Sequence, residues 1–384
     1  MKPAIAVLGA GPAGLTFARL LANKGIPCVV FERDPTPEIR THGGCLDLHK
    51  HNGQQALKEC GLFDKFRSLA RYDGQSFKAY DKQGTSLWDL PYTGEEDARP
   101  EIDRKDLRQL LLDSLAPGTI RWDAKVKSVQ RDQDGSMAIE LANGTVEKEF
   151  KLIVGADGAW SKARKLLISS EPVYSGMTFL QSTVDPSNPS HAKIAERAGT
   201  GTYMGLSDGK VLMAMRQSNG AYNIYAGLRL PEEFPKTSAE LIKSPARMRE
   251  HFIAEKFDDW ASDLTELFRE SDGEIYTWPM YMLPPESLPW KHQQGVTLLG
   301  DAAHLSITTG DGVNLAMEDA LDLAHEIESN GESNLDEAVR KYEEKMMPRG
   351  IKHMTETTQE VMQTLFAEDS PRGFKEWVAS MGQA

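Results

Sequence analysis

The sequence predicts an α/β fold in which a parallel sheet covered by helices is combined with an inserted antiparallel β-sheet. Two observations predict this class. Short apolar runs typical of strands buried on both faces, as in a parallel sheet, lie at 3–8, 26–33, 151–158 and 296–301. By contrast, residues 74–90 and 173–230 alternate apolar and polar residues and contain turn sequences such as LSDG and SNG, which favours antiparallel strands.

Length and composition limit the class of protein. With 384 residues, 40% of them hydrophobic, the chain can form one large or two interlocked, well-packed domains. The net charge of −13, without a long Lys/Arg run, disfavours nucleic acid and membrane surfaces as partners. The 3 cysteines show no CxxC spacing, which disfavours a disulfide framework and a zinc site and fits a reducing compartment. Because no apolar run approaches the roughly 20 residues that span a bilayer, we expect a soluble, cytoplasmic protein.

The first and last thirds of the chain provide the helices. The segment LTFARLLANKG, with Gly25 as its stop, follows the first apolar run, so residues 3–33 predict a βαβ beginning. Residues 103–115 predict an amphipathic helix with an Asp cap. Residues 335–366 predict a long helical tail, which Pro348 should interrupt or kink.

These patterns predict a discontinuous domain organisation. A dinucleotide-binding domain is expected from 1–73, 100–173 and 285–330. A substrate-binding domain is expected from 74–99 and 174–284, and a C-terminal helix that bridges the two domains from 335–384.

The stretch GAGPAG carries the strongest chemical signal. Gly9, Gly11 and Gly14, with Pro12 and Ala13 between them, form G-x-G-x-x-G after a strand and at the start of a helix. In a Rossmann-like domain these glycines allow the tight turn, the approach of a pyrophosphate and close helix packing, and the helix N-terminus supplies free N–H donors. Glu32 ends the second strand, where a carboxylate can accept from ribose hydroxyls. A structural turn with a surface glutamate is the alternative, and the motif alone does not distinguish FAD from NAD.

A second ligand-binding loop follows the last buried strand. In LLGDAAH, Gly300 and Asp301 lie at the carboxyl end of a strand, where parallel sheets bind ligands and where Asp301 can accept from a ribityl or ribose hydroxyl. The helix that follows begins near Gly310, Gly312, Val313 and Asn314. Its N-terminal amides could face the O2/N1 edge of an isoalloxazine and stabilise an anionic reduced flavin. A simple helix cap is the alternative role for Asp301.

Three motifs in this order resemble the FAD-dependent aromatic hydroxylases of the para-hydroxybenzoate hydroxylase type: GAGPAG…ER, GADGAWSKAR and LLGDAAH…GDGVNLAMEDAL. RTHGGCLDLHKHNGQQALKECGL and EIDRKDLRQLLLDSL also resemble segments of the Tet(X)-like tetracycline-modifying monooxygenases. The resemblance implies an FAD-binding domain, a β-sheet substrate domain and a bridging C-terminal helix.

The resemblance also implies roles for individual charged residues. Arg33 would lie near the adenine or diphosphate, Asp157 near the flavin and NADPH, and Arg104 near the ribityl chain. Asp47 would lie by the isoalloxazine, and Arg164 would complete the helix of the Asp-Gly motif. Each has an ordinary alternative, a turn former for Asp47 and a surface charge for the arginines.

Two segments depart from the family pattern. The loop LSITTGDG, with Ser306, Thr308 and Thr309, replaces a stretch that usually contains a proline and a large residue, and Trp160 stands where a smaller polar residue is common. In the sheet domain the pattern is weakest, because Asn223 and Tyr225 stand where the tetracycline enzymes tend to have histidine and glycine. Six residues are expected to line a substrate pocket: Gln181, Met213, Met215, Arg216, Asn223 and Tyr225. For the Met and Tyr residues among them, packing in the core is the commoner role.

The expected activity follows from the resemblance. NADPH would reduce FAD, O2 would form a flavin C4a-hydroperoxide, and a hydroxyl would pass to a phenolic or polycyclic aromatic substrate, with tetracycline as one candidate. No side chain is assigned a catalytic role, and His304 lacks both a nucleophile elbow and a metal-spaced partner. We expect a monomer without a metal.

Three alternatives remain at this point. One is a dehydrogenase or reductase that uses FAD on the same fold without oxygenation. The second is a non-enzymatic flavin-binding or drug-binding protein. The third is an NAD-dependent dehydrogenase, which would be colourless when purified. NADPH and NADH are not distinguished by the sequence.

Overall fold

A computed structural model of the chain describes residues 2–39, 43–94, 99–307 and 310–381. The acidic run at 95–97, which we expected to be a solvated loop, and Thr308 and Thr309 lie outside these residues. The chain divides into two compact units. Unit 1 comprises 1–70, 104–173 and 281–357, and unit 2 comprises 71–103, 174–280 and 358–384. Within the described ranges, every helix is too short or too polar to cross a bilayer.

Unit 1 is built on a five-stranded parallel sheet, which confirms the α/β fold class. Its strands, in spatial order, are β17 (Val296–Leu298), β11 (Leu152–Gly155), β1 (Ile5–Leu8), β2 (Cys28–Phe31) and β7 (Ile120–Arg121). The register sets Ile5 beside both Leu152 and Cys28, and β11 pairs in parallel with β17. β1 and β11 are buried at every position, as the unbroken apolar runs predict. The carboxyl ends of the strands that precede the candidate loops therefore share one edge of the sheet.

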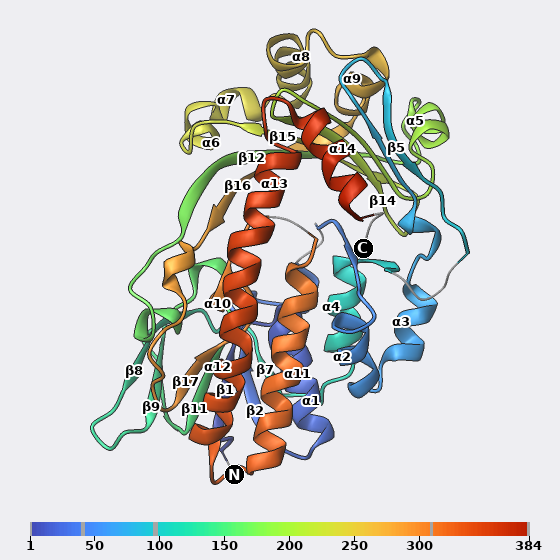
Figure 1. Ribbon diagram of the computed structural model, residues 1–384. Helices are drawn as coiled ribbons and strands as arrows, with labels where there is room; N and C mark the ends of the chain where they lie inside the picture. Colours follow the sequence, from blue (N-terminus) through green and yellow to red (C-terminus); the bar gives the residue numbers. More distant parts are fainter. Residues whose placement is uncertain (1, 40–42, 95–98, 308–309, 382–384) are drawn as a thin grey trace. The chain divides into compact units, whose positions relative to one another are not determined.

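Helices cover one face of this sheet. They are α1 (Pro12–Asn23), α2 (Gly53–Glu59), α3 (Phe63–Leu69), α4 (Arg104–Leu112), α10 (Asp301–His304), α11 (Gly312–Asn330) and α12 (Leu335–Lys352). α11 packs against both α1 and α12, and Figure 1 shows α11 and α12 side by side in front of the sheet. The expected helices after the glycine turn and at 103–115 are confirmed.

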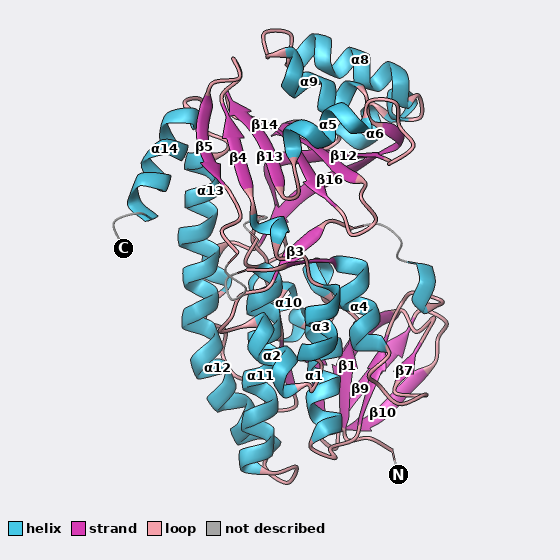
Figure 2. Ribbon diagram, turned by 90° about the vertical axis from the view of Figure 1, so that its right-hand side faces the viewer, coloured by secondary structure: helices cyan, strands magenta, loops and turns pink. Residues whose placement is uncertain are grey.

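A three-stranded antiparallel sheet, which we did not anticipate, completes unit 1. It consists of β8 (Val126–Arg131), β9 (Met137–Leu141) and β10 (Val146–Phe150). It lies on the side of β1 away from α11 and α12 (Figure 2), and the Phe150 ring meets the Phe31 ring edge-on at 6.0 Å. β8 and β10 are largely exposed and rich in charged residues, which explains why hydrophobic patterning did not reveal them.

Unit 2 contains a seven-stranded sheet in the order β16-β12-β15-β14-β13-β4-β5. Its strands are β4 (Phe77–Tyr80), β5 (Ser86–Leu90), β12 (Val173–Val184), β13 (Thr202–Ser207), β14 (Lys210–Arg216), β15 (Tyr222–Arg229) and β16 (Asp272–Met282). β12 to β15 pair antiparallel as expected, but β4 pairs parallel with β13, so this sheet is mixed. β4 comes from a segment far from β13 in the chain, so no hairpin turn dictates its direction.

Helices lie on both faces of the unit 2 sheet, as Figure 2 shows. On one face are α5 (His191–Ala198), α6 (Phe234–Thr237), α7 (Ala239–Ile242), α8 (Pro245–Lys256) and α9 (Ser262–Arg269). They bury a core formed with the even-numbered residues of β12, β14 and β15, such as Leu180, Leu212 and Ile224. On the other face, Phe366 contacts Phe179 between α13 (Thr358–Thr364) and α14 (Ser370–Met381).

The helical tail differs from expectation at Pro348. Pro348 lies inside α12, so the helix is not interrupted there. A π turn follows at His353–Thr357, and α13 begins at the next residue. Packing overrides the proline because Tyr342, Met346 and other residues on both sides of Pro348 are buried in unit 1. The division between the units falls at the end of the π turn, so the tail contributes residues to both.

Candidate functional site

The turn between β1 and α1 has the geometry of a phosphate-binding loop. Gly9 has φ of 99°, and a Cβ at Gly14 would lie 2.1 Å from the Gly9 carbonyl oxygen, so both positions require glycine. A Cβ at Gly11, in contrast, would meet no protein atom within 4 Å. Gly11 caps α1 without a side-chain hydrogen bond and Pro12 opens the helix, with Ala13 buried behind it. The amides at this end of α1 are therefore arranged for an anion.

Glu32 holds this turn from the end of β2. Its side chain is buried, Oε2 accepts a hydrogen bond from the Ala10 amide at 2.6 Å, and Oε1 accepts from the Asp34 amide at 3.0 Å. Glu32 thus shapes the glycine turn in addition to the ribose role that we predicted for it.

Arg108 is a site residue that the sequence reasoning missed. It is buried on α4, and its guanidinium donates to the carbonyl of Pro37 at 2.6 Å and to that of Ala10 at 3.4 Å. It also reaches the Asp34 carboxylate at 3.4 Å. Its position among buried leucines of the amphipathic helix was the available signal. Arg33 and Arg104, which we predict to lie near the adenine or diphosphate and near the ribityl chain, are both exposed.

Asp157 follows β11 and lies in the Asp-Gly loop. Its Oδ2 accepts a hydrogen bond from the Lys162 amide at 2.7 Å. Its Oδ1 is buried and has no hydrogen-bond partner among the described residues. Burial raises the pKa of this carboxyl group. A buried acceptor without a partner is destabilising by itself, so this atom is suited to a ligand hydroxyl or amide.

Arg164 joins the Asp-Gly loop to the loop after β17. Its buried guanidinium donates to the carbonyls of Ala302 at 3.2 Å and Asp301 at 3.4 Å, and also to that of Ala159. Burial lowers the pKa of the guanidinium, opposed by the nearby carboxylates. The side chain therefore fixes the backbone on which Asp301 stands. Asp301 itself is exposed, and its carboxylate makes no hydrogen bond with the described residues.

Gly300 places Asp301 at the end of β17. Its φ of 57° with ψ of −138° is accessible essentially only to glycine, and a Cβ would lie 2.9 Å from the Ala316 Cβ. The Gly300 amide donates to Asp319 Oδ2 at 2.9 Å. Asp319, on α11, thus holds the residue that sets the direction of the loop.

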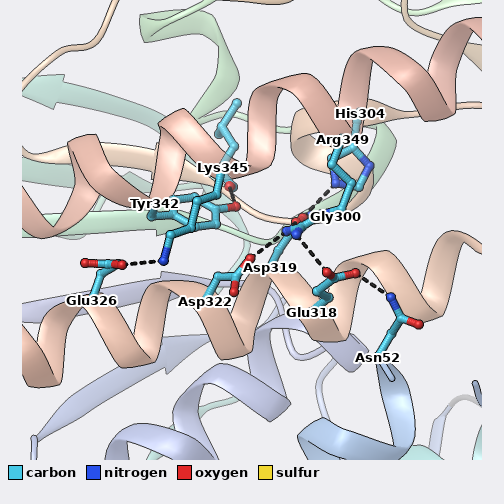
Figure 3. Close-up of polar contacts among 11 residues, drawn as sticks. Asn52, Gly300, His304, Glu318, Asp319, Asp322, Glu326, Tyr342, Lys345 and Arg349 are labelled. Carbon is cyan, nitrogen blue, oxygen red and sulfur yellow. Dashed lines mark hydrogen bonds and ion pairs between the residues drawn. The ribbon is translucent and has the colours of Figure 1, made fainter. Parts of the chain in front are cut away.

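Asp319 is the centre of a buried charged cluster, drawn in Figure 3. Its Oδ2 also contacts His304 Nε2 at 2.7 Å, and its Oδ1 accepts from Arg349 of α12 at 2.9 Å. Burial would raise the pKa of Asp319, but the charges of His304 and Arg349 lower it below its usual value. Burial would likewise lower the pKa of His304, but Asp319 raises it. His304 is therefore occupied in an ion pair and positions the loop.

Arg349 extends the cluster to two further carboxylates. It donates to Glu318 at 2.8 Å and to Asp322 at 2.9 Å, and Glu318 accepts from the Asn52 amide group at 2.5 Å. Figure 3 shows Glu318 and Asp322 on α11 directed toward the guanidinium, and Asn52 directed toward Glu318 from the segment before α2. The cluster links α12 to α11, and Asp319 connects it to the Gly300 amide.

The start of α11 clamps the segment that contains Asp47. The buried Asn314 accepts from the His49 amide at 2.8 Å and donates to the Asp47 carbonyl at 2.9 Å. The Asp47 carboxylate contacts His49 Nε2 at 2.9 Å, and Gly310, with φ of 91°, lies close to it. Gly312 opens α11, and Val313 is buried in its first turn. The structure thus brings Asp47 together with the expected flavin-facing helix start.

The residues of unit 1 fit a dinucleotide such as FAD. The glycine turn offers amides and open space at Gly11. Among the described residues, Asp157 Oδ1 is buried without a hydrogen-bond partner and the exposed Asp301 carboxylate has none. All three follow strands of the parallel sheet at the same edge. An elongated ligand with a diphosphate at one end and hydroxyls along its length matches this donor and acceptor set.

The predicted substrate residues lie on the unit 2 sheet. Gln181 and Met213 both pair with Tyr225, and Met215 pairs with Asn223, so these five side chains form two adjacent rows on one face. This face is opposite the helix-covered core. Arg216 follows Met215, and strand alternation directs it to the other face.

Comparison with known proteins identifies the family. The profile of the FAD binding domain family matches residues 2–267 and 278–357. The chain is 34% identical to the monooxygenase penA of Penicillium thymicola, over 91% of this chain and 92% of that protein. It is 29% identical to the 3-amino-4-hydroxybenzoate 2-monooxygenase PtnB3 of Streptomyces platensis, over 97% of this chain and 90% of that protein.

Solved structures show the same fold. HpxO of Klebsiella pneumoniae, solved with FAD and uric acid, superposes with a TM-score of 0.79 at 19% identity, over 99% of this chain and 93% of that chain. The tetracycline destructase Tet(51) superposes with a TM-score of 0.72 at 19% identity, over 100% of this chain and 96% of that chain. The glycine turn, the Asp-Gly loop and the Asp301 loop all fall within the matched family segments. The chain belongs to the FAD binding domain family and is an FAD-dependent monooxygenase of the aromatic hydroxylase type.

Proposed function

We propose that this monooxygenase takes electrons from NADPH and hydroxylates a phenolic or polycyclic aromatic compound, acting as a monomer. The observation that carries the proposal is a set of polar groups along one sheet edge of unit 1 that have no side-chain partner within the described part of the chain: the start of α1, Asp157 Oδ1 and the Asp301 carboxylate. When bound and reduced, FAD supplies the activation of O2 that hydroxyl transfer requires.

The residues of unit 1 would bind and orient the cofactor. The amides of Gly11 and the first turn of α1 would hold the diphosphate, and Glu32 the adenosine ribose. Asp301 would accept from the ribityl hydroxyls, and the first amides of α11 would face the O2/N1 edge of the flavin ring. Gly300, fixed by Asp319, sets the position of Asp301. No side chain is required as a nucleophile in this scheme.

The exposed Arg33 and Arg104 stay in the proposal as contacts of the adenine or diphosphate end and of the ribityl chain. Asp47, held by the Asn314 clamp, would lie by the isoalloxazine. Asp157 would accept from the cofactor or from NADPH, and Arg164 would keep the Asp-Gly loop in place. A substitution at one of these positions that leaves FAD affinity and the flavin spectrum unchanged would remove that residue from the scheme.

The test is substrate-dependent turnover. The FAD-loaded enzyme is incubated with NADPH or NADH, O2 and a panel of phenols and polycyclic aromatics, and the consumption of both co-substrates is followed together with the product mass. Stimulated consumption with a product heavier by one oxygen atom supports the proposal. Substrate conversion without oxygen insertion would instead favour a dehydrogenase or reductase, and tight ligand binding without turnover would favour a binding protein.

Tetracycline inactivation is a narrower candidate within this proposal. It is supported by the motif resemblance and by the shared fold with Tet(51), whose identity to this chain is 19%. Incubation with NADPH and tetracycline tests it directly. Unchanged absorbance and mass of the drug would remove tetracyclines from the substrate range while leaving the monooxygenase proposal intact.

A further inference from the structure

One face of the unit 2 sheet is formed almost entirely by neutral side chains. Strand register places Gln181, Tyr225 and Met213 in one row across β12, β15 and β14. The adjacent row is formed by Thr183, Asn223, Met215, Thr202 and Phe77 across β12, β15, β14, β13 and β4. Thioethers, amides, hydroxyls and aromatic rings therefore alternate over this face, which suits a flat apolar molecule with a few polar atoms.

Aromatic residues border the two rows within unit 2. The Phe179 ring contacts Phe366 at 5.8 Å and Tyr225 at 6.4 Å, edge-on in both cases. A Cβ at Gly227 would lie 2.5 Å from the Phe179 ring, so the glycine leaves room for the ring over β15. On the far side, Phe77 stacks on Phe374 of α14 at 6.2 Å.

Cationic side chains of the sheet strands are almost absent from this face. The Arg71 guanidinium, which donates to the Arg216 carbonyl at 3.0 Å, is paired with Glu101 and Asp103. Among the basic residues of the sheet strands, Lys78, Lys210 and Arg216 pair with residues of the opposite face, which packs against α5 to α9. Arg229 shares the face but stands four residues beyond Tyr225, roughly 13 Å along the strand. It is exposed and directed to the Phe366 carbonyl.

Gln181 supplies an oriented hydrogen-bond donor on this face. Its Oε1 accepts from Trp278 Nε1 at 2.8 Å, and because an indole nitrogen only donates, the two ends of the amide are assigned without ambiguity. The side chain is 6% exposed, and its Nε2 makes no hydrogen bond with the described residues. This N–H donor is therefore open to a ligand oxygen, which would replace solvent as its acceptor.

We propose that this face binds a neutral aromatic molecule whose carbonyl or hydroxyl oxygen accepts from Gln181 Nε2, and that it discriminates against aromatic carboxylates and phosphates. The inference rests on the proposed function, because it specifies the substrate class of the proposed monooxygenase. A carboxylate placed here would lose its hydration without gaining a cation, and one neutral donor does not compensate for that loss. PtnB3, by its name, acts on a hydroxybenzoate, so this chain would differ from that relative in the charge of its substrate.

The test compares three ligands with the same ring system on the FAD-loaded enzyme, by equilibrium dialysis without NADPH. The ligands are 2-naphthol, which is neutral with a hydroxyl, 6-hydroxy-2-naphthoate, which adds a carboxylate, and naphthalene, which has no oxygen. We expect 2-naphthol to bind at least about tenfold more tightly than 6-hydroxy-2-naphthoate. Equal or tighter binding of the carboxylate would overturn the proposal.

Two substitutions test the residues that carry the argument. Gln181→Met removes the donor at similar volume, so 2-naphthol should bind about three- to tenfold more weakly while naphthalene is unaffected. Met213→Lys adds a cation beside Tyr225 and should raise the affinity for 6-hydroxy-2-naphthoate by about tenfold or more. Thr237→Lys adds the same charge at an exposed position of α6 and should change neither affinity.

The outcomes separate this inference from the proposed function. If Gln181→Met weakens naphthalene and 2-naphthol alike, or Met213→Lys does not favour the carboxylate, the inference is wrong whatever the turnover. If the neutral ligand is preferred as expected but NADPH and O2 are never consumed, the proposed function fails and the ligand preference stands. Turnover confined to aromatic carboxylates would retain the monooxygenase and refute the substrate class.

Discussion

Replacing Arg349 by methionine should destabilise unit 1 strongly, because it removes the cation that neutralises a buried carboxylate. Arg349 contacts Asp319, which is fully buried, at 2.9 Å, and two partly exposed carboxylates, Glu318 and Asp322, at 2.8 and 2.9 Å. Methionine keeps most of the side-chain volume and removes the charge. After the substitution, His304 would be the remaining charged partner of Asp319 among the described residues.

The magnitude follows from the burial of each partner. Leaving one member of a buried ion pair uncompensated typically destabilises a protein by about 3–5 kcal/mol. His304 retains part of the compensation for Asp319, while each of the two partly exposed carboxylates adds only about 0.5 kcal/mol. We therefore expect Arg349→Met to lower the free energy of unfolding of unit 1 by about 3 kcal/mol. For a unit of roughly 200 residues this corresponds to a decrease in Tm of about 6–12 °C.

A matched control lies on the same helix. Arg340 is also on α12 and pairs with Asp336 at 3.2 Å, but both side chains are substantially exposed. Arg340→Met should therefore change the unfolding free energy by less than about 0.5 kcal/mol. Urea unfolding of the apo-protein, followed by circular dichroism and by indole fluorescence, measures both variants. If Arg349→Met falls within about 1 kcal/mol of Arg340→Met, the charged cluster does not stabilise unit 1 as argued.

Three further substitutions test the cofactor site and the pH dependence. Gly14→Ala should destabilise the apo-protein by about 2 kcal/mol, because its Cβ would overlap a backbone oxygen. Gly11→Ala should leave the stability of the apo-protein unchanged and weaken FAD binding at least about tenfold in a flavin-fluorescence titration. Equal behaviour of the two variants would contradict this geometry. Asp301→Asn should lower FAD affinity about tenfold without changing the apo Tm, because the carboxylate is exposed and has no described partner; an unchanged affinity would remove Asp301 from the site. Burial and the charge of His304 lower the pKa of His353 to about 4. Between about pH 6.5 and 4 this histidine is protonated in the unfolded chain but neutral in the folded one, so folding stability is lost as the pH falls through that range. In urea titrations His353→Gln should abolish about 2–3 kcal/mol of this loss, and an identical pH profile for variant and wild type would refute it.

Much of the cofactor site could be predicted because its requirements are local in sequence. The spacing of Gly9, Gly11 and Gly14 between a buried strand and a helix reflects backbone geometry that few other residues allow. Gly300 and Asp301 are likewise adjacent at a strand end, so their position at the sheet edge follows from the strand alone. The strands of the parallel sheet were visible because burial on both faces produces unbroken apolar runs.

The parts that escaped prediction depend on contacts between distant segments. Asp319 meets His304 and Arg349 at separations of 15 and 30 residues, and no sequence pattern links three charged residues on three helices to one glycine amide. Arg108 was not singled out from the sequence, because an arginine on an amphipathic helix is usually a surface charge. The tail continued past Pro348 because tertiary packing outweighed one missing helical hydrogen bond.

The direction of β4 and the side-chain contacts on the unit 2 sheet also depend on segments that are distant in sequence. β4 lies more than 100 residues before its neighbour β13, so neither a turn nor a hairpin sequence sets their relative direction. The register of β14 and β15 places Met213 and Met215 on one face and separates Arg216 from them, although the sequence analysis grouped all three in one expected pocket. The sequence pattern could not predict the Trp278 contact that orients Gln181, because β16 joins the sheet from far along the chain.

The most direct test of this account is a titration of the purified apo-protein with FAD, followed by absorbance in the flavin bands and by protein-bound flavin after gel filtration. The account predicts one FAD per chain, with affinity strongly reduced in a Gly11→Ala, Asp301→Asn double variant that keeps the unfolding profile of the apo-protein. A protein that retains no flavin in excess FAD, or a double variant that binds FAD as tightly as the wild type, would contradict it.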